Sequence, residues 1–505
     1  ESLKDSLNPT DFDPAEWARI IDDAGMRYMI FTTKHHDGFC MFDSRLTDYS
    51  IAHGPFAGDP RRDFARHVFD AFRDRGLMTG AYFSKPDWHS QWFWNPAYAT
   101  PNRHINYKKE RHPDWWRNYQ DYTAGQLGEI LNNYGPLDIL WLDGGWISGD
   151  DIRLDSILAD ARSSRQPGLL AVDRTIRGRN ENYQTPERGI PDRQLSQPWE
   201  SCIPLSNDWG WVPDAPYKSP EKVIATLIET VAKGGNLLLG VGPTAQGTIE
   251  PEVERRLHSI GKWLRRNGEA IYNTTTTPLY RDSCIWFTAS HDGNTRYALY
   301  AHEENSPMPK RLTWKGNLPA GKMTLLDGEK PLSYSIKGDE VTVKLPGNVK
   351  AGSLAIRFTP RDTMPAYKNP RLTTDARVAD LLRRMTLEEK IGQLLCPMGW
   401  EMYVREGDQV RPSEAFLEAN ASAMAPGSYW AVMRADPWTQ KTIDNGLTPS
   451  LAAEAANLLQ REAMEKTCLG IPLLFAEECA HGHMAIGSTV FPTGLLMAAT
   501  FNDSL

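Results

Sequence analysis

The sequence predicts an α/β protein: an incomplete TIM-like (β/α) barrel, then an antiparallel β-sandwich, then a partial second (β/α) barrel. Three observations lead to this order. Between residues 13 and 266, short apolar runs alternate with helical patterns, which is typical of βα units in a parallel sheet. From 273 to 360 the pattern changes to alternating strands at hairpin spacing. A proline-spaced stretch then leads into helical sequence again.

The composition is that of an ordinary globular protein. The chain has 505 residues, 40% hydrophobic and 24% charged, which is enough for two or three domains. A net charge of −8 without lysine-arginine blocks argues against nucleic-acid binding, and no apolar run is long enough to span a membrane. Seventeen Trp and 18 Tyr suit stacking on sugar faces, although a large core explains them equally well. The six cysteines show no metal-ligand spacing, so no metal or cofactor is expected.

The barrel region opens with a well-delimited helix. Asp13 can cap it, Pro14 takes the first helical position, Glu16 falls three residues after the cap, and Gly25 follows its end. Six strands follow, fewer than the eight of a complete barrel. They are expected at residues 27–33, 77–83, 138–142, 169–172, 198–202 and 236–241. The helices between them are expected at 63–75, 115–134, 151–161, 220–233 and 251–266.

The rest of the chain divides at the proline-spaced stretch. Strands of the sandwich are expected at 284–290, 296–302, 312–315, 323–326, 341–345 and 354–358. Helical sequence resumes near Asp375 and includes a capping box, Thr386 to Glu389, before an apolar run. The expected domains are the barrel at 1–272, the sandwich at 273–360, a linker at 361–373 and the last unit at 374–505.

In a parallel barrel, catalytic groups come from the C-terminal ends of strands. Asp143 directly follows an apolar run there and precedes two glycines, which leave open backbone where a ligand can approach. The alternative is that Asp143 caps the next helix. Glycoside hydrolysis needs a second carboxyl group, about 5–5.5 Å away for retention or about 6.5–9.5 Å for inversion. The candidates are Glu187, in a proline-bracketed loop that also fits a solvated glutamate, and Glu200, which could instead hold a sugar hydroxyl.

His35 and His36 form the other polar pair at a strand end. Neighbouring strand residues point to opposite faces, so only one of them can face the barrel axis unless the strand ends there. A lone histidine in such a place is often a hydrogen-bonded core residue. Metal ligation would require further His, Asp or Glu ligands at other strand ends, where Trp, Arg and Ser prevail instead.

Three separated motifs resemble the α-L-fucosidases of glycoside hydrolase family 29. They are KHHDGF at residues 34–39, WLDG at 141–144 and AKGGNLLLGVGP at 232–243, in the family's order. The resemblance covers about residues 8–272, with the sandwich to about 360 as the family's usual companion. It implies a retaining, metal-independent exo-hydrolase that acts on terminal α-L-fucose, with a fucosylated oligosaccharide or polysaccharide as its partner.

The resemblance also implies roles for particular residues. Asp143 matches the family nucleophile, and Glu187 stands where one branch of the family has its acid/base. Glu200 matches a glutamate also proposed for that role, and we favour Glu187. The matching sugar-binding residues are His35, His36, Trp141, Arg174 and Trp209, to which we add Trp88 at the second strand end.

The sequence departs from this family at its start. Members open with a first barrel strand that ends in a Phe-His-Trp-Gly-like motif, and nothing before Asp11 matches it. We therefore expect a barrel that lacks its first strand and has open edges, a chain that represents a fragment, and doubtful hydrolytic activity.

The last unit resembles the N-terminal part of a glycoside hydrolase family 3 β-glycosidase over about residues 365–505. The motifs are YKNP at 367–370, LLRRMTLEEKIGQL at 381–394, LGIPLLFAEECAHG at 469–482 and TVFP at 489–492. Glu478 stands where that family has an acid that holds the sugar, and His481 completes the motif. The family's nucleophile lies beyond Leu505, so this unit is not expected to be catalytic alone.

The sequence thus favours an exo-acting α-L-fucosidase fused to a β-glycosidase module and exported to a periplasmic or extracellular space. Two alternatives stay open. One is a β-glucosidase or β-xylosidase with a vestigial fucosidase half. The other is a fucose-binding module without turnover.

Overall fold

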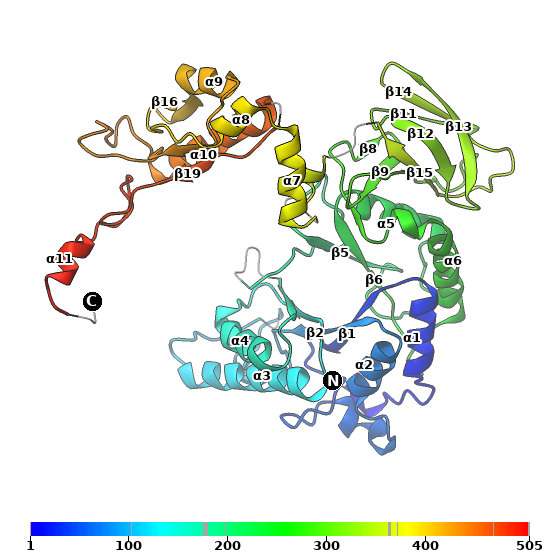
Figure 1. The fold of residues 1–505 in the computed structure, drawn as a ribbon. Coiled ribbons are helices and arrows are strands. Elements are labelled where there is room, and N and C mark those ends of the chain that lie inside the picture. Colours follow the sequence, from blue (N-terminus) through cyan, green and yellow to red (C-terminus); the bar gives the residue numbers. More distant parts are fainter. Residues whose placement is uncertain are drawn as a thin grey trace. The chain divides into compact units, whose positions relative to one another are not determined.

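The computed structural model describes residues 2–102, 104–174, 180–195, 197–361, 365–370, 372–467 and 469–502. The chain divides into two compact units, Glu1–Met364 and Pro365–Leu505, and each is described by itself (Figure 1). The boundary falls inside the stretch that the sequence marks as a linker. No helix in the described part of the chain is both long and apolar enough to cross a membrane.

The first unit opens with helix α1 (Pro14–Asp23), which begins where the sequence predicts. The carboxylate of Asp13 accepts hydrogen bonds from the amides of Ala15 and Glu16. Such a cap stabilises a helix by about 1 kcal/mol. Gly25 follows the helix with a φ of 81°, a left-handed conformation that glycine adopts without strain.

Six parallel strands form the wall of a TIM-like barrel. One sheet has the order β1 (Tyr28–Lys34), β2 (Met78–Ser84), β3 (Ile139–Asp143) and β4 (Leu170–Asp173), and a second pairs β5 (Trp199–Pro204) with β6 (Gly235–Gly240). All six lie within one or two residues of their predicted positions. The segment 182–188 runs between the sheets, because Asn182 donates its amide to Ala171 of β4 and Arg188 donates its amide to Cys202 of β5.

The wall is open between β1 and β6. Within the described ranges, β1 forms a ladder with β2 alone and β6 with β5 alone. A cavity of about 630 Å³ lies between them, lined along most of its length by both strands. It is mainly apolar but ends at the polar groups that follow the strands.

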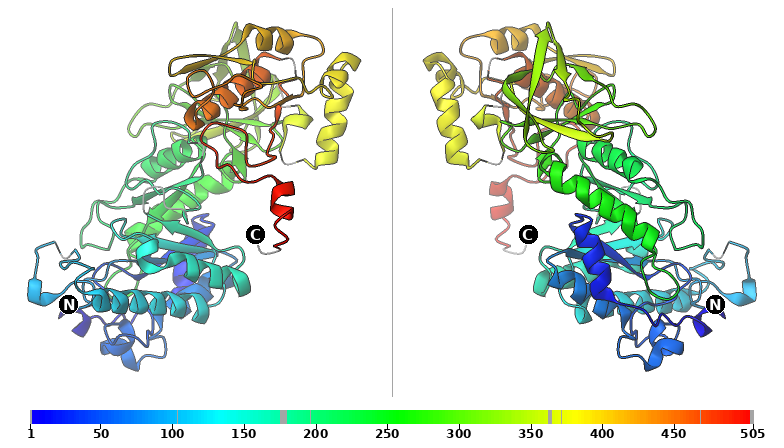
Figure 2. Two further views of the ribbon diagram at one scale, coloured as in Figure 1. Left: turned by 90° about the vertical axis from the view of Figure 1, so that its left-hand side faces the viewer. Right: turned by 90° about the vertical axis from the view of Figure 1, so that its right-hand side faces the viewer.

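Helices pack around the outside of the strands (Figure 1). They are α2 (Phe64–Asp74), α3 (Pro113–Asn133), α4 (Leu154–Ser164), α5 (Pro220–Ala232) and α6 (Pro251–Asn267), all near their predicted positions. One core packs β2 and β3 against α3 through residues such as Phe83, Leu140 and Leu127. A second packs α1 beside α6, seen as the blue and green helices in the right view of Figure 2, through Ile20 and Leu257.

An antiparallel sheet follows the barrel within the same unit and folds around its own core, which includes Phe287, Trp314 and Phe358. Its strands are β7 (Thr274–Thr275), β8 (Arg281–Asp282), β9 (Ile285–Ser290), β10 (Arg296–Tyr300), β11 (Arg311–Lys315), β12 (Pro319–Leu325), β13 (Lys330–Lys337), β14 (Glu340–Lys344) and β15 (Leu354–Pro360). The sequence does not predict the two-residue strands β7 and β8 or the longer β13. Few side chains of β13 are buried, and its polar residues hide the alternation. Trp286 and Leu299 join the core of α5 and α6, so the sheet and the barrel share a packed interface.

The second unit contains short elements. They are α7 (Thr374–Arg384), α8 (Leu387–Gly392), β16 (Tyr403–Glu406), β17 (Gln409–Pro412), α9 (Glu414–Ala421), β18 (Ser428–Trp430), α10 (Pro449–Lys466), β19 (Leu474–Ala476) and α11 (Gly494–Ala498). The predicted capping box is confirmed, because the Thr386 hydroxyl and the Glu389 carboxylate each accept the other residue's amide. Strand β18 pairs in parallel with β19, with α10 between them in the chain.

Candidate active site

Asp143 lies at the end of β3, and its carboxylate has several hydrogen-bond donors. Oδ2 accepts the Tyr82 hydroxyl at 2.6 Å, and Oδ1 accepts the Gly144 amide at 2.7 Å. The Arg174 guanidinium lies 3.2 Å from Oδ1, and Nε2 of His36 lies 3.7 Å from Oδ2. Helix α4 is preceded by Arg153 instead, so the alternative that Asp143 caps this helix is wrong.

The surroundings of Asp143 keep it ionised. Burial alone would raise the pKa of this carboxyl, but the hydrogen bond from Tyr82 and the charge of Arg174 outweigh burial and lower the pKa below its ordinary value. A carboxylate that is charged, yet largely shielded from water, is suited to attack an electrophilic carbon.

Both His35 and His36 lie beside Asp143. Strand β1 ends at Lys34, so the alternation of side chains stops there and the two imidazole rings come within 4.3 Å of each other. Burial, followed by the neighbouring His35, lowers the pKa of His36 to about 4. A neutral His36 can both donate and accept hydrogen bonds, as sugar hydroxyls require.

A row of aromatic rings joins these histidines to the centre of the barrel. Tyr82 stacks on Trp141 with centroids 5.3 Å apart and on His35 at 6.0 Å. Trp141 is buried at 2% exposure, and its indole donates to Glu200 at 3.0 Å. The side chains of His35, Tyr82, Trp141 and Glu200 therefore belong to one packed layer at the strand ends.

Glu200 and Glu187 occupy different environments. Glu200 is 2% exposed and accepts hydrogen bonds from Tyr28 and Trp141, and burial raises its pKa above the ordinary value. Glu187 is exposed, lines the cavity together with Asp143, and accepts a hydrogen bond of 2.8 Å from Arg174. The same guanidinium thus contacts both Asp143 and Glu187.

The loop of Glu187 is fixed beside β5. Its backbone forms bridges with Trp199 and Cys202, through hydrogen bonds such as the one that the Arg188 amide donates to the Cys202 carbonyl at 2.8 Å. Two flanking prolines further restrict this backbone, and the Glu187 side chain lines the cavity.

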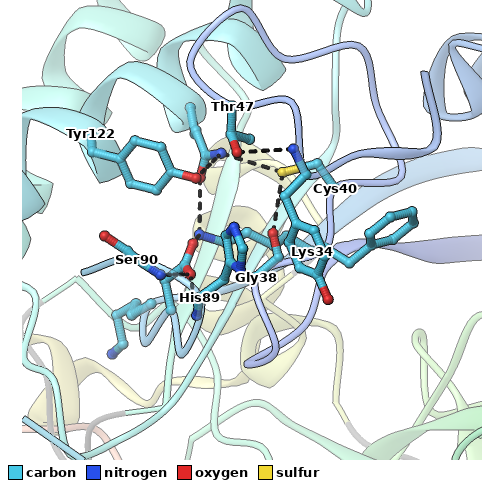
Figure 3. A network of polar contacts seen from close by, with 12 residues as sticks. Lys34, Gly38, Cys40, Thr47, His89, Ser90 and Tyr122 are labelled. Carbon is cyan, nitrogen blue, oxygen red and sulfur yellow. Dashed lines mark hydrogen bonds and ion pairs between the residues drawn. The ribbon is translucent and has the colours of Figure 1, made fainter. Parts of the chain in front are cut away.

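A buried ion pair supports the loop that holds the histidines (Figure 3). Nζ of Lys34 lies 3.0 Å from the Asp87 carboxylate and 2.9 Å from Oε1 of the Gln126 side chain. The charged side chains of Lys34 and Asp87 are at most 1% exposed. The Asp87 carboxylate in turn accepts the amides of His89 and Ser90. A second buried pair, Lys85 with Asp173, joins the ends of β2 and β4.

The other expected sugar-binding residues divide between the two units. Trp88 is half-buried and packs against His36 with ring centroids 5.4 Å apart, and Trp209 is 41% exposed and lines the cavity. Glu478 and His481 belong to the second unit, where Glu478 pairs with Arg434 and His481 is half-buried.

Tyr82 is the residue at this site that the sequence analysis missed. It lies inside an apolar run, and this pattern predicts a strand residue that packs in the core. The available signal was the period of two, because Tyr82 shares a face with Ser84 at the end of β2 and the two hydroxyls lie 3.1 Å apart.

His35, His36 and Asp143 could also bind a metal ion, since each offers a ligand atom within 4.8 Å of the others. Both oxygens of Asp143, however, already accept hydrogen bonds, one of them from the cationic Arg174. An ion there would meet this positive charge at close range, so the donor set fits a cation poorly.

A parallel barrel with an ionised carboxylate at a strand end, a second carboxylate across one arginine, and histidines and aromatic rings around both defines a glycoside hydrolase site. The sequence profile of the family described as alpha-L-fucosidase matches residues 1–269, more than half of the chain. The chain belongs to the α-L-fucosidase family and is a glycoside hydrolase.

Individual relatives agree with this assignment. The α-L-fucosidase isoenzyme 1 from Paenibacillus thiaminolyticus has a similar structure, with a TM-score of 0.63 and 31% identity over 72% of this chain and 89% of that one. A Bacteroides thetaiotaomicron α-L-fucosidase of family GH29 was solved as a trapped covalent intermediate. It has a TM-score of 0.61 and 26% identity over 72% of this chain and 85% of that one. Plasma alpha-L-fucosidase from Homo sapiens is 29% identical over 375 residues, which are 68% of this chain and 77% of that protein.

Proposed function

We propose that the first unit is a retaining, exo-acting α-L-fucosidase that releases terminal α-L-fucose from glycans, with Asp143 as nucleophile and Glu187 as acid/base. The observation behind this assignment is the position of Arg174, whose guanidinium donates to Glu187 at 2.8 Å and lies 3.2 Å from Asp143. One rigid group therefore holds both carboxylates at the edge of the same cavity.

The mechanism follows from this pair. Ionised Asp143 attacks C1 of fucose while protonated Glu187 gives its proton to the leaving oxygen, so the glycosidic bond breaks as an ester bond to Asp143 forms. Glu187 then takes a proton from water, which attacks C1 and frees both fucose and Asp143. The covalent intermediate trapped in the Bacteroides relative supports a retaining course.

The two glutamates differ in what they can do. Glu187 is exposed and can exchange protons with the leaving group and with water. Glu200 accepts hydrogen bonds from Tyr28 and Trp141 in the interior and is not among the residues that line the cavity. We assign Glu200 the role of fixing the Trp141 ring, and Glu187 the acid/base role.

We assign the sugar-binding roles to the side chains around Asp143. Neutral His36, together with His35, is suited to hold fucose hydroxyls. The exposed ring of Trp209 offers an apolar face for the sugar, and the buried ring of Trp141 lines the same cavity. Arg174 holds the carboxylates, and Trp88 packs behind His36.

A third carboxyl group is the competitor for the acid role. Burial, followed by the charge of Asp173, raises the pKa of Glu181 to about 7, which suits a general acid. The described contacts do not join Glu181 to Asp143 by a hydrogen bond or an ion pair. Glu187, which shares Arg174 with Asp143, is therefore preferred.

Hydrolysis of a chromogenic α-L-fucoside tests the function. Turnover that survives a chelator is expected, since the site needs no metal. Calorimetry with L-fucose tests the alternative of a fucose-binding module. If the protein binds L-fucose but does not hydrolyse the fucoside, that alternative is favoured over the enzyme. Loss of turnover on removal of metal would instead favour a metal-dependent hydrolase.

For the second unit we propose the N-terminal part of a family 3 β-glycosidase module, a partial barrel in which Glu478 and His481 contact sugar. The parallel pairing of β18 and β19 across α10 supports a βα arrangement. The proposed domains are the barrel at 1–272, the sandwich at 273–360, a linker at 361–373 and the β-glycosidase-like unit at 374–505. In a protein that also carries the family 3 nucleophile, hydrolysis of a β-glucoside or β-xyloside but not of an α-L-fucoside would mark the fucosidase half as vestigial.

We further propose that the protein is exported. The support is that matched relatives from Homo sapiens and Pongo abelii are plasma enzymes by name. Fractionation of cells that express the complete gene product, with activity measured in the medium and in the cell extract, tests this location.

A further inference from the structure

The glycine turn that follows Asp143 is tightly packed on both sides. Gly144 has a φ of 88°, in the left-handed region, and a Cβ atom at this position would overlap Pro86. A Cβ atom at Gly145 would overlap the backbone carbonyl of Arg174. The turn therefore lies between the segment that follows β2 and the segment that follows β4.

The backbone of each flanking segment is also hydrogen-bonded to β3. The Lys85 amide donates to the Asp143 carbonyl at 3.0 Å, and the Arg174 amide donates to the Leu142 carbonyl at 3.3 Å. Strands β2 and β4 are the two neighbours of β3 in the sheet, so their ends approach the proposed nucleophile from opposite sides.

A buried ion pair connects these two segments. Nζ of Lys85 pairs with the carboxylate of Asp173, and the two side chains are 0% and 2% exposed. Lys85 directly precedes Pro86. Asp173 directly precedes Arg174. The buried Tyr119 of α3 donates its hydroxyl to the Lys85 carbonyl at 2.6 Å, so the pair is also fixed against the outer helix.

Stability alone is a weak reason for such a pair. Taking two charges out of water is unfavourable, and apolar side chains often replace a buried pair without loss of stability. The fold nevertheless leaves space for this one, because a Cβ atom at Gly149 would lie 2.8 Å from Oδ2 of Asp173. A hydrogen-bonded ion pair is directional, and so it fixes the two segments relative to each other.

The position of Arg174 affects the charge of Asp143. Burial raises the pKa of Asp143, whereas the hydrogen bond from Tyr82 and the charge of Arg174 lower it. Nε2 of His36 also faces this carboxylate at 3.7 Å, and Glu187 shares the guanidinium of Arg174. A guanidinium that is held less closely would lower the pKa less, because charge interactions weaken with distance.

We propose that Lys85 and Asp173 are positioning residues for fucoside hydrolysis, an inference that rests on the proposed function. Their ion pair holds Pro86 and the Arg174 backbone against the glycine turn, and so fixes the Asp143 carboxylate beside the guanidinium. Neither Lys85 nor Asp173 is among the residues that line the cavity. The pair therefore acts on the nucleophile and its arginine, and not on the sugar.

The test replaces the pair by apolar side chains. Lys85→Met and Asp173→Leu are compared singly and combined, because each single variant leaves a buried charge without this partner and the double variant does not. The double variant removes one charge of each sign, so its direct electrostatic effect on Asp143 is small. Lys233→Met is the matched control, because Lys233 is a buried lysine that pairs with Glu229 just before β6, at the opposite end of the strands.

In the double variant, kcat on a chromogenic α-L-fucoside is expected to fall about 10²-fold, as a misplacement of about 1 Å predicts. KM should change less than kcat, because no sugar-binding side chain is replaced. The acid limb of the pH profile of kcat/KM should move to higher pH, since the pKa of Asp143 rises when Arg174 is held less closely. Asp173→Asn, which keeps an acceptor for Lys85, should change kcat and the acid limb in the same directions by less.

Urea unfolding separates positioning from stability. The single variants should unfold at lower urea concentration, while the double variant should unfold near the unmodified chain and still have the low kcat. If kcat recovers together with the unfolding midpoint, or if the acid limb does not move, the positioning role is overturned and the fucosidase remains. The same loss of kcat in Lys233→Met would also contradict it. If the unmodified chain hydrolyses no fucoside, the proposed function fails and this inference fails with it.

Discussion

Two strand ends in this protein present a carboxylate for which a role in sugar binding is predicted, and their surroundings differ sharply. After β3, Asp143 accepts hydrogen bonds from a tyrosine and a backbone amide and lies against an arginine in a closely packed layer. After β19, Glu478 pairs with Arg434, and apolar side chains of the same unit, such as Leu474 and Leu495, are 73% and 83% exposed. A carboxylate at a strand end becomes a reactive group only where neighbouring elements complete its environment.

The largest expected effect separates these two carboxylates. Asp143→Gly should lower kcat on an α-L-fucoside by on the order of 10⁴-fold, because it removes the group that forms the covalent intermediate. Glu478→Gln is the matched control and should leave the rate within about twofold, as expected for a group outside the transition state. Steady-state kinetics on a chromogenic fucoside decides this. A comparable loss in Glu478→Gln would show that the second unit takes part in fucoside hydrolysis.

The next effect compares the two glutamates near β5. Glu187→Ala should lower the rate about 10²–10⁴-fold, and exogenous azide should restore part of it, because azide is an anion that attacks C1 of the fucosyl-enzyme and displaces Asp143 without needing a base. Glu200→Ala should not be restored, since its role is to hold Trp141. Identification of fucosyl azide as product checks the assignment. Rescue of Glu200→Ala alone would reverse it, and rescue of Glu181→Ala would transfer the role to that residue.

A stability measurement compares the buried and the exposed ion pairs. Lys34→Met should lower the free energy of unfolding of the first unit by about 3–5 kcal/mol, because Asp87 would keep a buried charge without its partner. The exposed pair of Arg117 with Asp114 in the same unit is the control, and Arg117→Met should cost at most about 1 kcal/mol. Urea unfolding followed by tryptophan fluorescence measures both. Equal losses would show that the network of Figure 3 does not stabilise the fold.

The smallest effect concerns pH. His36 has a pKa of about 4 in the folded chain, below its ordinary value of 6.5, so the unfolded chain binds an additional proton between these pH values. The folded state therefore keeps its full stability above about pH 6.5 and loses stability as the pH falls towards 4. This contribution should reach about 3 kcal/mol at pH 4 and be absent in His36→Gln, when both are compared by denaturant unfolding. Parallel pH profiles of the two proteins would contradict it.

Much of the barrel and of its site could be predicted from the sequence. Alternation of apolar runs with helical patterns located all six strands, because a parallel sheet buries both faces and each strand reads as a continuous apolar run. The strand ends then pointed to Asp143, His35 and His36, and the family resemblance added Arg174. Strand β13 was missed, since an exposed strand has no such run. Tyr82 was missed because a tyrosine inside a strand reads as packing until its hydroxyl is seen against a carboxylate.

The sequence by itself determined which chemical groups stand at the ends of the strands, because local periodicity and turn residues define where each strand stops. Only the tertiary structure decided how those groups act on one another. Glu187 and Glu200 look alike in the sequence, yet one is exposed beside Arg174 and the other is buried under Trp141. Burial and through-space charge set the reactivity of a carboxyl group, and both depend on residues far away in the chain.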